Sequence, residues 1–273
     1  MPASFSTLFS ASWTAFKARF KPLLIVAAVF GVILAVIQCI PLFVLTGGRT
    51  FDPSMAVFLL VYVLCMVVVG VIAGAATLSV CIEGYRSVGE TLMRALALAF
   101  PLFMVGIWML IKTYTWIPFV LLCLIPLFPS ALPAAPLLML VMAVLAVVFA
   151  PRYVLASVLL LSEKKDPRGA VQQSFTVTRG YWGKVVGNLL LLGIVLWVVM
   201  VAASIVLGVL GLDVPVLKFG ADGMLKFASG ASPRVLIGGI VSSVVSMLSQ
   251  GFLVFFLVQL AQTLKAHPQK AAK

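Results

Sequence analysis

The stretch from Glu163 to Asn188 reads EKKDPRGAVQQSFTVTRGYWGKVVGN and is the most polar segment between two long apolar blocks. Asp166-Pro167 predicts the start of a helix, because proline fits the first turn, where its missing N–H costs little. One face of this helix is then formed at helical spacing by Val171, Phe175, Thr178 and Trp182. The helix is too polar to span a bilayer, so we expect it to lie in the interface plane, with its rings at the acyl boundary.

Two further segments repeat this pattern. Near the N-terminus a stripe at helical spacing is formed by Phe5, Leu8, Phe9, Ser12, Phe16 and Phe20, and Ser87–Phe100 repeats it more weakly. This favours a single membrane domain over residues 1–273, built from three repeats at 1–82, 83–161 and 162–264 and followed by a polar tail at 265–273. Each repeat would hold an interfacial amphipathic helix and two spanning helices. The alternative is that any multi-pass protein places basic amphipathic linkers before its helices.

The composition is that of an integral membrane protein. The chain is 63% hydrophobic, far above the apolar share of about one half in soluble domains. Only 10% of its residues are charged, and its mean hydropathy is +1.24. Its net charge of +12 does not indicate nucleic acid, because the cations flank apolar runs, where they set topology and meet anionic lipid. We expect membrane lipids as partners and no nucleic acid.

The apolar runs predict an all-α polytopic fold with six transmembrane helices and about three interfacial helices on the cytoplasmic face. Runs of about 24 residues or more are long enough to cross the hydrocarbon core, and we place them at 22–45, 55–82, 101–128, 137–161, 185–210 and 235–264. Pro118 is expected to break the third span and Pro151 to kink the fourth. Gly70 and Gly74 have the spacing that lets another helix approach closely.

The distribution of Lys and Arg sets the topology. The predicted side that holds the N-terminus, the linker before residue 101, the stretch around 163–184 together with Arg152, and the tail carries 14 of these residues, and the other side carries four. The positive-inside rule therefore predicts that both termini lie in the cytoplasm.

Several polar residues fall inside the predicted spans. If a spanning helix begins at Pro101, Lys112 lies about 17 Å along it, near mid-bilayer, where charge is expensive and often functional. The alternative is that the apolar run ends at Ile111 and the lysine snorkels to an interface. The sixth span carries Ser242, Ser246, Ser249 and Gln250, which suit either a polar path or ordinary helix packing.

The candidates for lipid headgroup contact are the interfacial residues Arg152, Arg168, Arg179, Lys184 and Trp182. Basic residues on a cytoplasmic interface bind lipid phosphate groups. The alternative is that they only signal topology and snorkel. No catalytic, cofactor-binding or metal-binding residues are predicted, because the chain has no carboxylate pair within the spans, no zinc-protease or P-loop motif and one histidine. We therefore expect no enzyme activity and no cofactor.

The segment SFTVTRGYWGKVVGN resembles a motif of the membrane domain associated with some bacterial glycerophosphodiester phosphodiesterases, and of YciC-like uncharacterised inner-membrane proteins. The matching positions are Ser174, Phe175 (where the family has Trp), Thr178, Arg179, Gly180, Trp182 and Gly187. The resemblance implies six spanning helices over nearly the whole chain and a place in the bacterial inner membrane. It carries no activity, because in those proteins the phosphodiesterase chemistry belongs to a separate soluble barrel.

Three functional hypotheses follow. The first is a non-enzymatic membrane protein that engages lipid headgroups, most naturally anionic ones, or supports envelope homeostasis. The second is a small transporter or lipid flippase with a polar path near Lys112 and the sixth span. The third is a membrane scaffold for a partner enzyme, by analogy with the fused phosphodiesterases, in which case a partner protein would bind.

Overall fold

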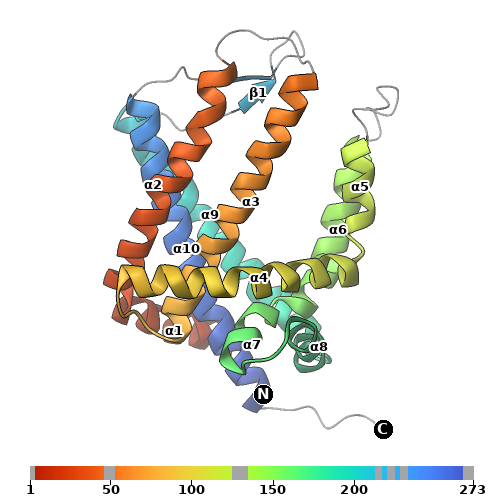
Figure 1. The fold of residues 1–273 in the computed structure, drawn as a ribbon. Helices are drawn as coiled ribbons and strands as arrows, with labels where there is room; N and C mark the ends of the chain where they lie inside the picture. The colour runs from red at the N-terminus through yellow and green to blue at the C-terminus, as the bar shows by residue number, and fades with distance from the viewer. Residues whose placement is uncertain are drawn as a thin grey trace. The chain divides into compact units, whose positions relative to one another are not determined.

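A computed structural model describes residues 4–45, 53–124, 135–212, 217–219, 225–227 and 233–266 (Figure 1). The helices within these ranges are α1 (Phe5–Ala18), α2 (Phe20–Leu45), α3 (Pro53–Ile82), α4 (Val88–Thr113), α5 (Trp116–Leu124), α6 (Ala135–Tyr153), α7 (Ala156–Ser162), α8 (Pro167–Thr178), α9 (Trp182–Val209) and α10 (Pro233–Ala266). Two three-residue strands, β1 (Leu217–Phe219) and β2 (Leu225–Phe227), pair antiparallel with Lys218 opposite Lys226. This hairpin lies in what the sequence predicted as a plain loop.

The predicted fold class is confirmed: the protein is a helical multi-pass membrane protein. Six stretches of the described chain are long and apolar enough to cross a membrane, and they lie in α2, α3, α4, α6 with α7, α9 and α10. The exposed side chains of these helices are largely aliphatic, as expected for surfaces solvated by lipid. The polar tail from residue 267 and the predicted turn around Pro129 lie outside the described residues.

The predicted third span is wrong in its bounds. Pro101 does not begin a helix but lies inside α4, which runs unbroken from Val88 to Thr113. The helix stops at Tyr114, whose φ of +58° takes the backbone into the left-handed region. The predicted interfacial segment 87–100 and the first half of the predicted span therefore form one helix, because the apolar periodicity continues through the proline.

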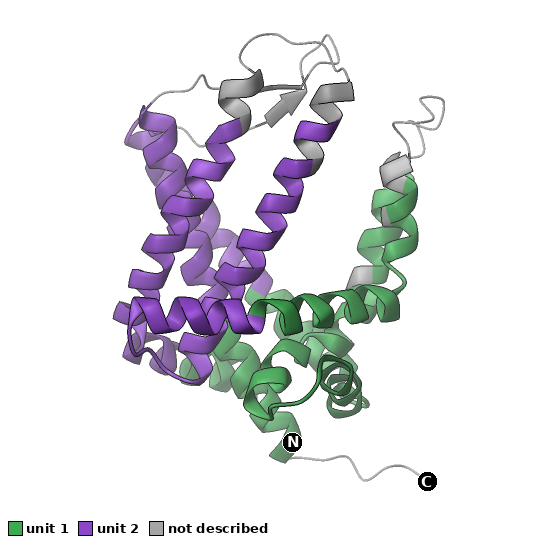
Figure 2. Cartoon of the chain, in the orientation of Figure 1, with its two compact units in different colours: residues 1–12, 99–192, 254–273 green, residues 13–98, 193–253 purple. Residues whose placement is uncertain are grey.

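The chain forms two compact units, shown in different colours in Figure 2. Unit 1 comprises residues 1–12, 99–192 and 254–273, and unit 2 comprises residues 13–98 and 193–253. The first and last predicted repeats share an element order, with a short helix followed by two long ones, whereas the middle section has a long helix first and a short one second. The threefold repeat itself stays a prediction.

In unit 2, α2, α3 and α10 pack closely because glycines remove side chains at the crossings. A Cβ on Gly31 of α2 would lie 2.7 Å from the Val244 side chain of α10, and one on Gly251 would lie 3.3 Å from Leu23. By contrast, a Cβ on Gly70 or Gly74 would meet nothing within 4 Å. The close helix approach predicted for that glycine pair is therefore absent among the described residues.

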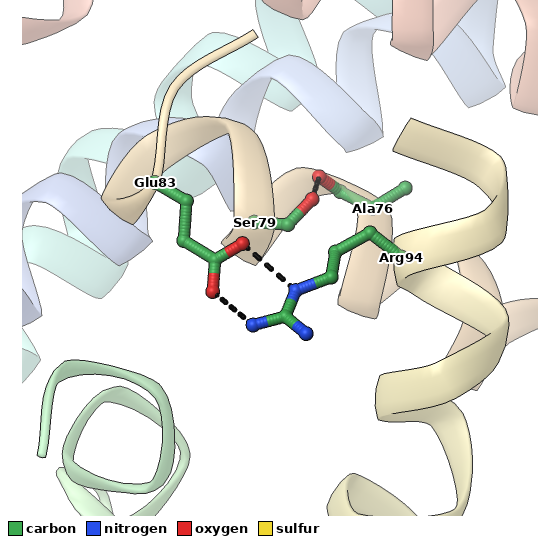
Figure 3. Close-up of polar contacts among 4 residues, drawn as sticks. All are labelled: Ala76, Ser79, Glu83 and Arg94. Atoms are coloured by element: carbon green, nitrogen blue, oxygen red, sulfur yellow. Dashed lines mark hydrogen bonds and ion pairs between the residues drawn. The ribbon is translucent and has the colours of Figure 1, made fainter. Parts of the chain in front are cut away.

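Side chains also hold the C-terminal end of α3 in unit 2. The Arg19 guanidinium donates to the backbone carbonyls of Val80 and Cys81 at 2.8 and 2.7 Å, which satisfies carbonyls that lack a partner at a helix end. Glu83, just past α3, accepts two hydrogen bonds from Arg94 of α4, and Ser79 donates to the Ala76 carbonyl within α3 (Figure 3). The bidentate geometry fixes where α4 begins relative to α3.

In unit 1, α8 packs against α6 and α7, and fully buried side chains come from α7, α8 and α10. Leu155 and Leu159 are fully buried, as are Ala170 of α8 and Phe256 of α10. Phe5 of α1 lies against Phe256, with ring centroids 5.8 Å apart. The apolar stripe predicted for the N-terminal helix therefore packs, at this point, on protein.

Candidate functional site

The opening segment folds as α8, with the predicted start. Asp166 caps the helix by accepting a hydrogen bond from the Gly169 N–H at 3.1 Å, and Pro167 occupies the first turn. This cap satisfies one of the donors that a helix N-terminus leaves free. The helix ends at Thr178, and Gly180 adopts a φ of +84°, a conformation that glycine adopts without strain.

The face predicted to meet lipid instead packs on protein. Val171 and Thr178 are buried, together with Ala170 and Ser174 on the same side of α8, whereas Phe175 is only half-buried. This face lies against α6 and α7. Trp182 does not belong to the stripe, because the helix breaks and Trp182 begins α9. The buried face carries hydroxyls, which need protein partners rather than lipid.

Those hydroxyls, both in the motif that carries the family resemblance, converge on the end of α6. The Ser174 hydroxyl donates at 3.0 Å to the Arg152 carbonyl, in the last turn of α6, where carbonyls lack helical partners. The Thr178 hydroxyl lies 3.0 Å from the same carbonyl and 2.8 Å from the Ser174 carbonyl of its own helix, so its proton is shared between the two acceptors. The Trp182 indole N–H donates to the Val148 carbonyl at 2.9 Å, one turn earlier. These three motif residues therefore dock α8 and α9 on α6.

This docking creates a pocket of about 350 Å³, which we call the cationic pocket. Its lining comes from the end of α4, the end of α6 and the first turns of α8, and consists of Trp108, Lys112, Tyr153, Arg168, Val171, Gln172 and Phe175. Its volume is in the range of small-molecule sites. Among the described lining residues none is acidic, so two cations share the pocket without a carboxylate.

Aromatic rings orient the guanidinium groups around the cationic pocket. The Arg168 guanidinium lies over the Trp108 ring, 5.6 Å from its centroid. Arg152, just outside the lining, lies over both Phe149 and Phe175 at 5.8 and 5.9 Å. Stacking on a ring face leaves the edge of a guanidinium free to donate hydrogen bonds. In the part of the chain that the structure describes, no ion pair joins Lys112 or Arg168 to a carboxylate.

The mid-bilayer placement of Lys112 assumed a helix that begins at Pro101, and no helix begins there. Lys112 lies in the last turn of α4, about 36 Å along the helix from Val88 at 1.5 Å per residue, and its side chain is exposed. The sequence left open whether Lys112 forms an interior site or ends an apolar run and snorkels to an interface. Its position in the last turn of α4 favours the second alternative.

The other predicted site residues divide between two places. Arg179 follows α8 as its C-terminal cap, and Lys184 is exposed in the first turn of α9; neither lines the cationic pocket. In unit 2, Ser242, Ser246 and Gln250 line a separate hollow, whereas Ser249 does not.

Sequence reasoning missed Trp108, Tyr153 and Gln172. A usable signal was that Trp108 precedes Lys112 by four residues and so shares its helix face.

Beside the cationic pocket, Glu163 ties the α7–α8 turn to the end of α10. Its carboxylate accepts a hydrogen bond from the Lys265 ammonium and pairs with Lys165 at 3.5 Å. The Lys265 ammonium holds the pKa of the Glu163 carboxyl below its ordinary value. Lys265, predicted to start a solvated tail, is thus part of α10 and anchored to unit 1.

Within the described residues, no three His, Cys, Asp or Glu side chains are grouped so that they could hold a metal ion. Comparison of the chain with protein-family models, curated proteins and solved structures gave no match. The fold defines a multi-pass helical membrane protein, and within its described residues the cationic pocket brings Lys112 and Arg168 into one lining.

Proposed function

We propose that this chain is a non-enzymatic bacterial inner-membrane protein, with both termini in the cytoplasm, that binds the phosphate-bearing headgroups of anionic lipids in the cationic pocket. The single observation that carries the proposal is that Lys112 and Arg168 line one pocket in which no described residue is acidic. Like charges that share a site repel one another, and a bound anion removes this repulsion.

The remaining lining supports a phosphate ligand. The planar edge of Arg168 suits bidentate recognition of phosphate, while Lys112 adds a mobile point charge. Gln172 supplies amide donors and Tyr153 a hydroxyl. Val171 and Phe175 add apolar wall, which suits the part of a lipid next to its headgroup. The positive-inside count favours the cytoplasmic leaflet for this pocket, and that leaflet carries anionic lipid.

The test is lipid retention by the full chain in mild detergent, measured by native mass spectrometry with phosphatidylglycerol and phosphatidylcholine as competing probes. Each cation near an anionic surface is worth about 1 kcal/mol, which is about fivefold in dissociation constant. Lys112→Gln and Arg168→Gln should each weaken phosphatidylglycerol retention about fivefold, and the double variant about 30-fold, while phosphatidylcholine retention changes little.

Lys184→Gln is the matched control, because it removes an exposed cation that does not line the pocket. An equal loss with Lys184→Gln would indicate diffuse attraction to the membrane surface and would reject the pocket. Unchanged phosphatidylglycerol retention in the double variant would reject lipid binding at this site altogether.

A further inference from the structure

A second cavity lies within unit 2, among α2, α3, α9 and α10, and has a volume of about 190 Å³. We call it the polar hollow. Its polar lining consists of Gln38, Ser242, Ser243, Ser246 and Gln250, and its remaining lining of Leu34, Gly70, Ala73, Met200 and Met247. Two amides and three hydroxyls thus come together from α2 and α10, and none of the described lining residues is charged.

The polar hollow lies well inside the membrane-spanning helices. Ser246 is 13 residues from the start of α10 and 20 from its end, so it lies about 20 Å along the helix at 1.5 Å per residue. Gly70 lies well inside α3, within its membrane-spanning stretch. Polar side chains at this depth are expensive unless they have hydrogen-bonding partners, and they commonly mark ligand or solute sites.

The five polar side chains do not satisfy one another. None of them forms a hydrogen bond with another residue in the described ranges, although serines elsewhere in these helices donate to their own helix, as Ser204 does to the Met200 carbonyl. Ser243 is itself a buried residue and lines the cavity. The hydroxyls and amides therefore offer both donors and acceptors to whatever fills the cavity.

We propose that the polar hollow is a binding site for a small uncharged molecule that carries several hydroxyl groups. The lack of charge in the lining disfavours an ion at this depth, because an unpaired ion away from water is costly. At about 30 Å³ for each water-sized group, the cavity holds about six such groups. A three-carbon polyol has about that many non-hydrogen atoms. This site is independent of the anionic-lipid proposal, since it lies in the other unit.

Gly70 and Gly74 provide a sharp pair of variants. Both lie on α3 and both have open space where a Cβ would stand, but only Gly70 lines the polar hollow. Leucine is a far better helix former than glycine, so neither substitution should disrupt α3. Gly70→Leu should fill the cavity, and Gly74→Leu should leave it open.

The experiment is saturation-transfer NMR on the full chain in lipid nanodiscs, with glycerol as the uncharged probe and glycerate as a charged probe on the same carbon skeleton. Wild type and Gly74→Leu should transfer saturation to glycerol above the level of empty nanodiscs, and Gly70→Leu should fall to that level. Glycerate should give no signal above empty nanodiscs with any variant.

The double variant Ser243→Ala with Ser246→Ala removes hydroxyls without adding bulk and should also lose the glycerol signal. If Gly70→Leu fails to fold, this double variant tests the polar hollow in its place. The proposal is overturned if wild type shows no glycerol signal above empty nanodiscs. It is equally overturned if both variants keep the wild-type signal, or if glycerate gives the same signal as glycerol.

Discussion

Ser174 and Thr178 share one acceptor, and this predicts a strong non-additivity between their substitutions. The Ser174 hydroxyl donates to the Arg152 carbonyl at 3.0 Å. The single Thr178 hydroxyl proton is shared between the same carbonyl at 3.0 Å and the Ser174 carbonyl of its own helix at 2.8 Å, so it can turn to Arg152 when the Ser174 hydroxyl is removed. Both residues are buried. A carbonyl that keeps one of two donors is still satisfied, whereas a buried carbonyl that loses both is not. Thr178→Val and Ser174→Ala remove the hydroxyls with little change in shape.

The magnitude follows from the cost of hydrogen bonds. Each single variant loses one bond of a pair and should lower the free energy of unfolding by about 0.5 kcal/mol, at the low end for a bond in protein. The double variant leaves the Arg152 carbonyl buried without these donors and should cost about 2–3 kcal/mol. The coupling between the two sites is then about 1–2 kcal/mol, well within what a double-mutant cycle resolves.

The assay is equilibrium unfolding in mixed micelles, with the four members of the cycle measured side by side. Thr176→Val serves as the control, because the Thr176 hydroxyl donates to the Gln172 carbonyl on the exposed side of α8 and its loss should change stability by less than about 0.5 kcal/mol. If the losses of the two single variants sum to the loss of the double variant, the shared-acceptor reasoning is refuted.

Two further predictions concern the packing of each unit. In unit 1 the folded-state pKa of Glu163 lies below its ordinary value of 4.5, so the stabilisation by Lys265 is present above that value and is lost as the pH falls through the lowered pKa. Thermal unfolding from about pH 6 down to about pH 3 should therefore show a loss of up to about 1 kcal/mol that is absent in Glu163→Gln. Equal losses in both proteins would contradict this prediction. In unit 2, Gly31→Ala places a Cβ 2.7 Å from the Val244 side chain and should lower the free energy of unfolding by about 1–3 kcal/mol. The control Gly193→Ala, whose Cβ meets nothing within 4 Å, should not lower it. Equal stability of the two variants would show that α2 and α10 are not closely packed at Gly31.

The elements that the sequence predicted well are those set by local chemistry. The start of α8 follows from Asp166 and Pro167 alone, because a cap and a first-turn proline act within one turn. Most membrane spans follow from runs of apolar residues, since length and composition decide them. The bounds of the third span differ from the prediction because Pro101 lies inside α4 and does not start a helix; a proline inside such a helix is tolerated when neighbours accommodate it.

The sites depend on contacts between segments far apart in the chain, and these were not predictable from one sequence. Lys112 and Arg168 meet only because α8 docks on the end of α6, which depends on the hydroxyls of Ser174 and Thr178. The same segment led us to expect a lipid-facing stripe, because helical periodicity identifies an apolar face but not what covers it. Gln38 was missed for a similar reason: a single amide in an apolar run becomes informative only beside the serines of α10.

The placement of Lys112 also bears on the direction of α4 in the membrane. The linker before α4 carries Arg86 and is assigned to the cytoplasm by the positive-inside count, and the far end of α4 shares the cationic pocket with Arg168, on a segment assigned to the same side. A helix with both ends on one side does not cross, although α4 is apolar enough to do so. Within unit 1, α4 also runs crosswise to α5 and α6 (Figure 1). We therefore predict that α4 lies in the cytoplasmic interface, that the chain crosses outward for the third time through α5 instead, and that α6 remains the fourth crossing. In a background without native cysteines, Tyr114→Cys should react with an impermeant maleimide in inverted vesicles but not in spheroplasts, and Ala221→Cys should do the reverse; labelling of Tyr114→Cys in spheroplasts would show that α4 crosses.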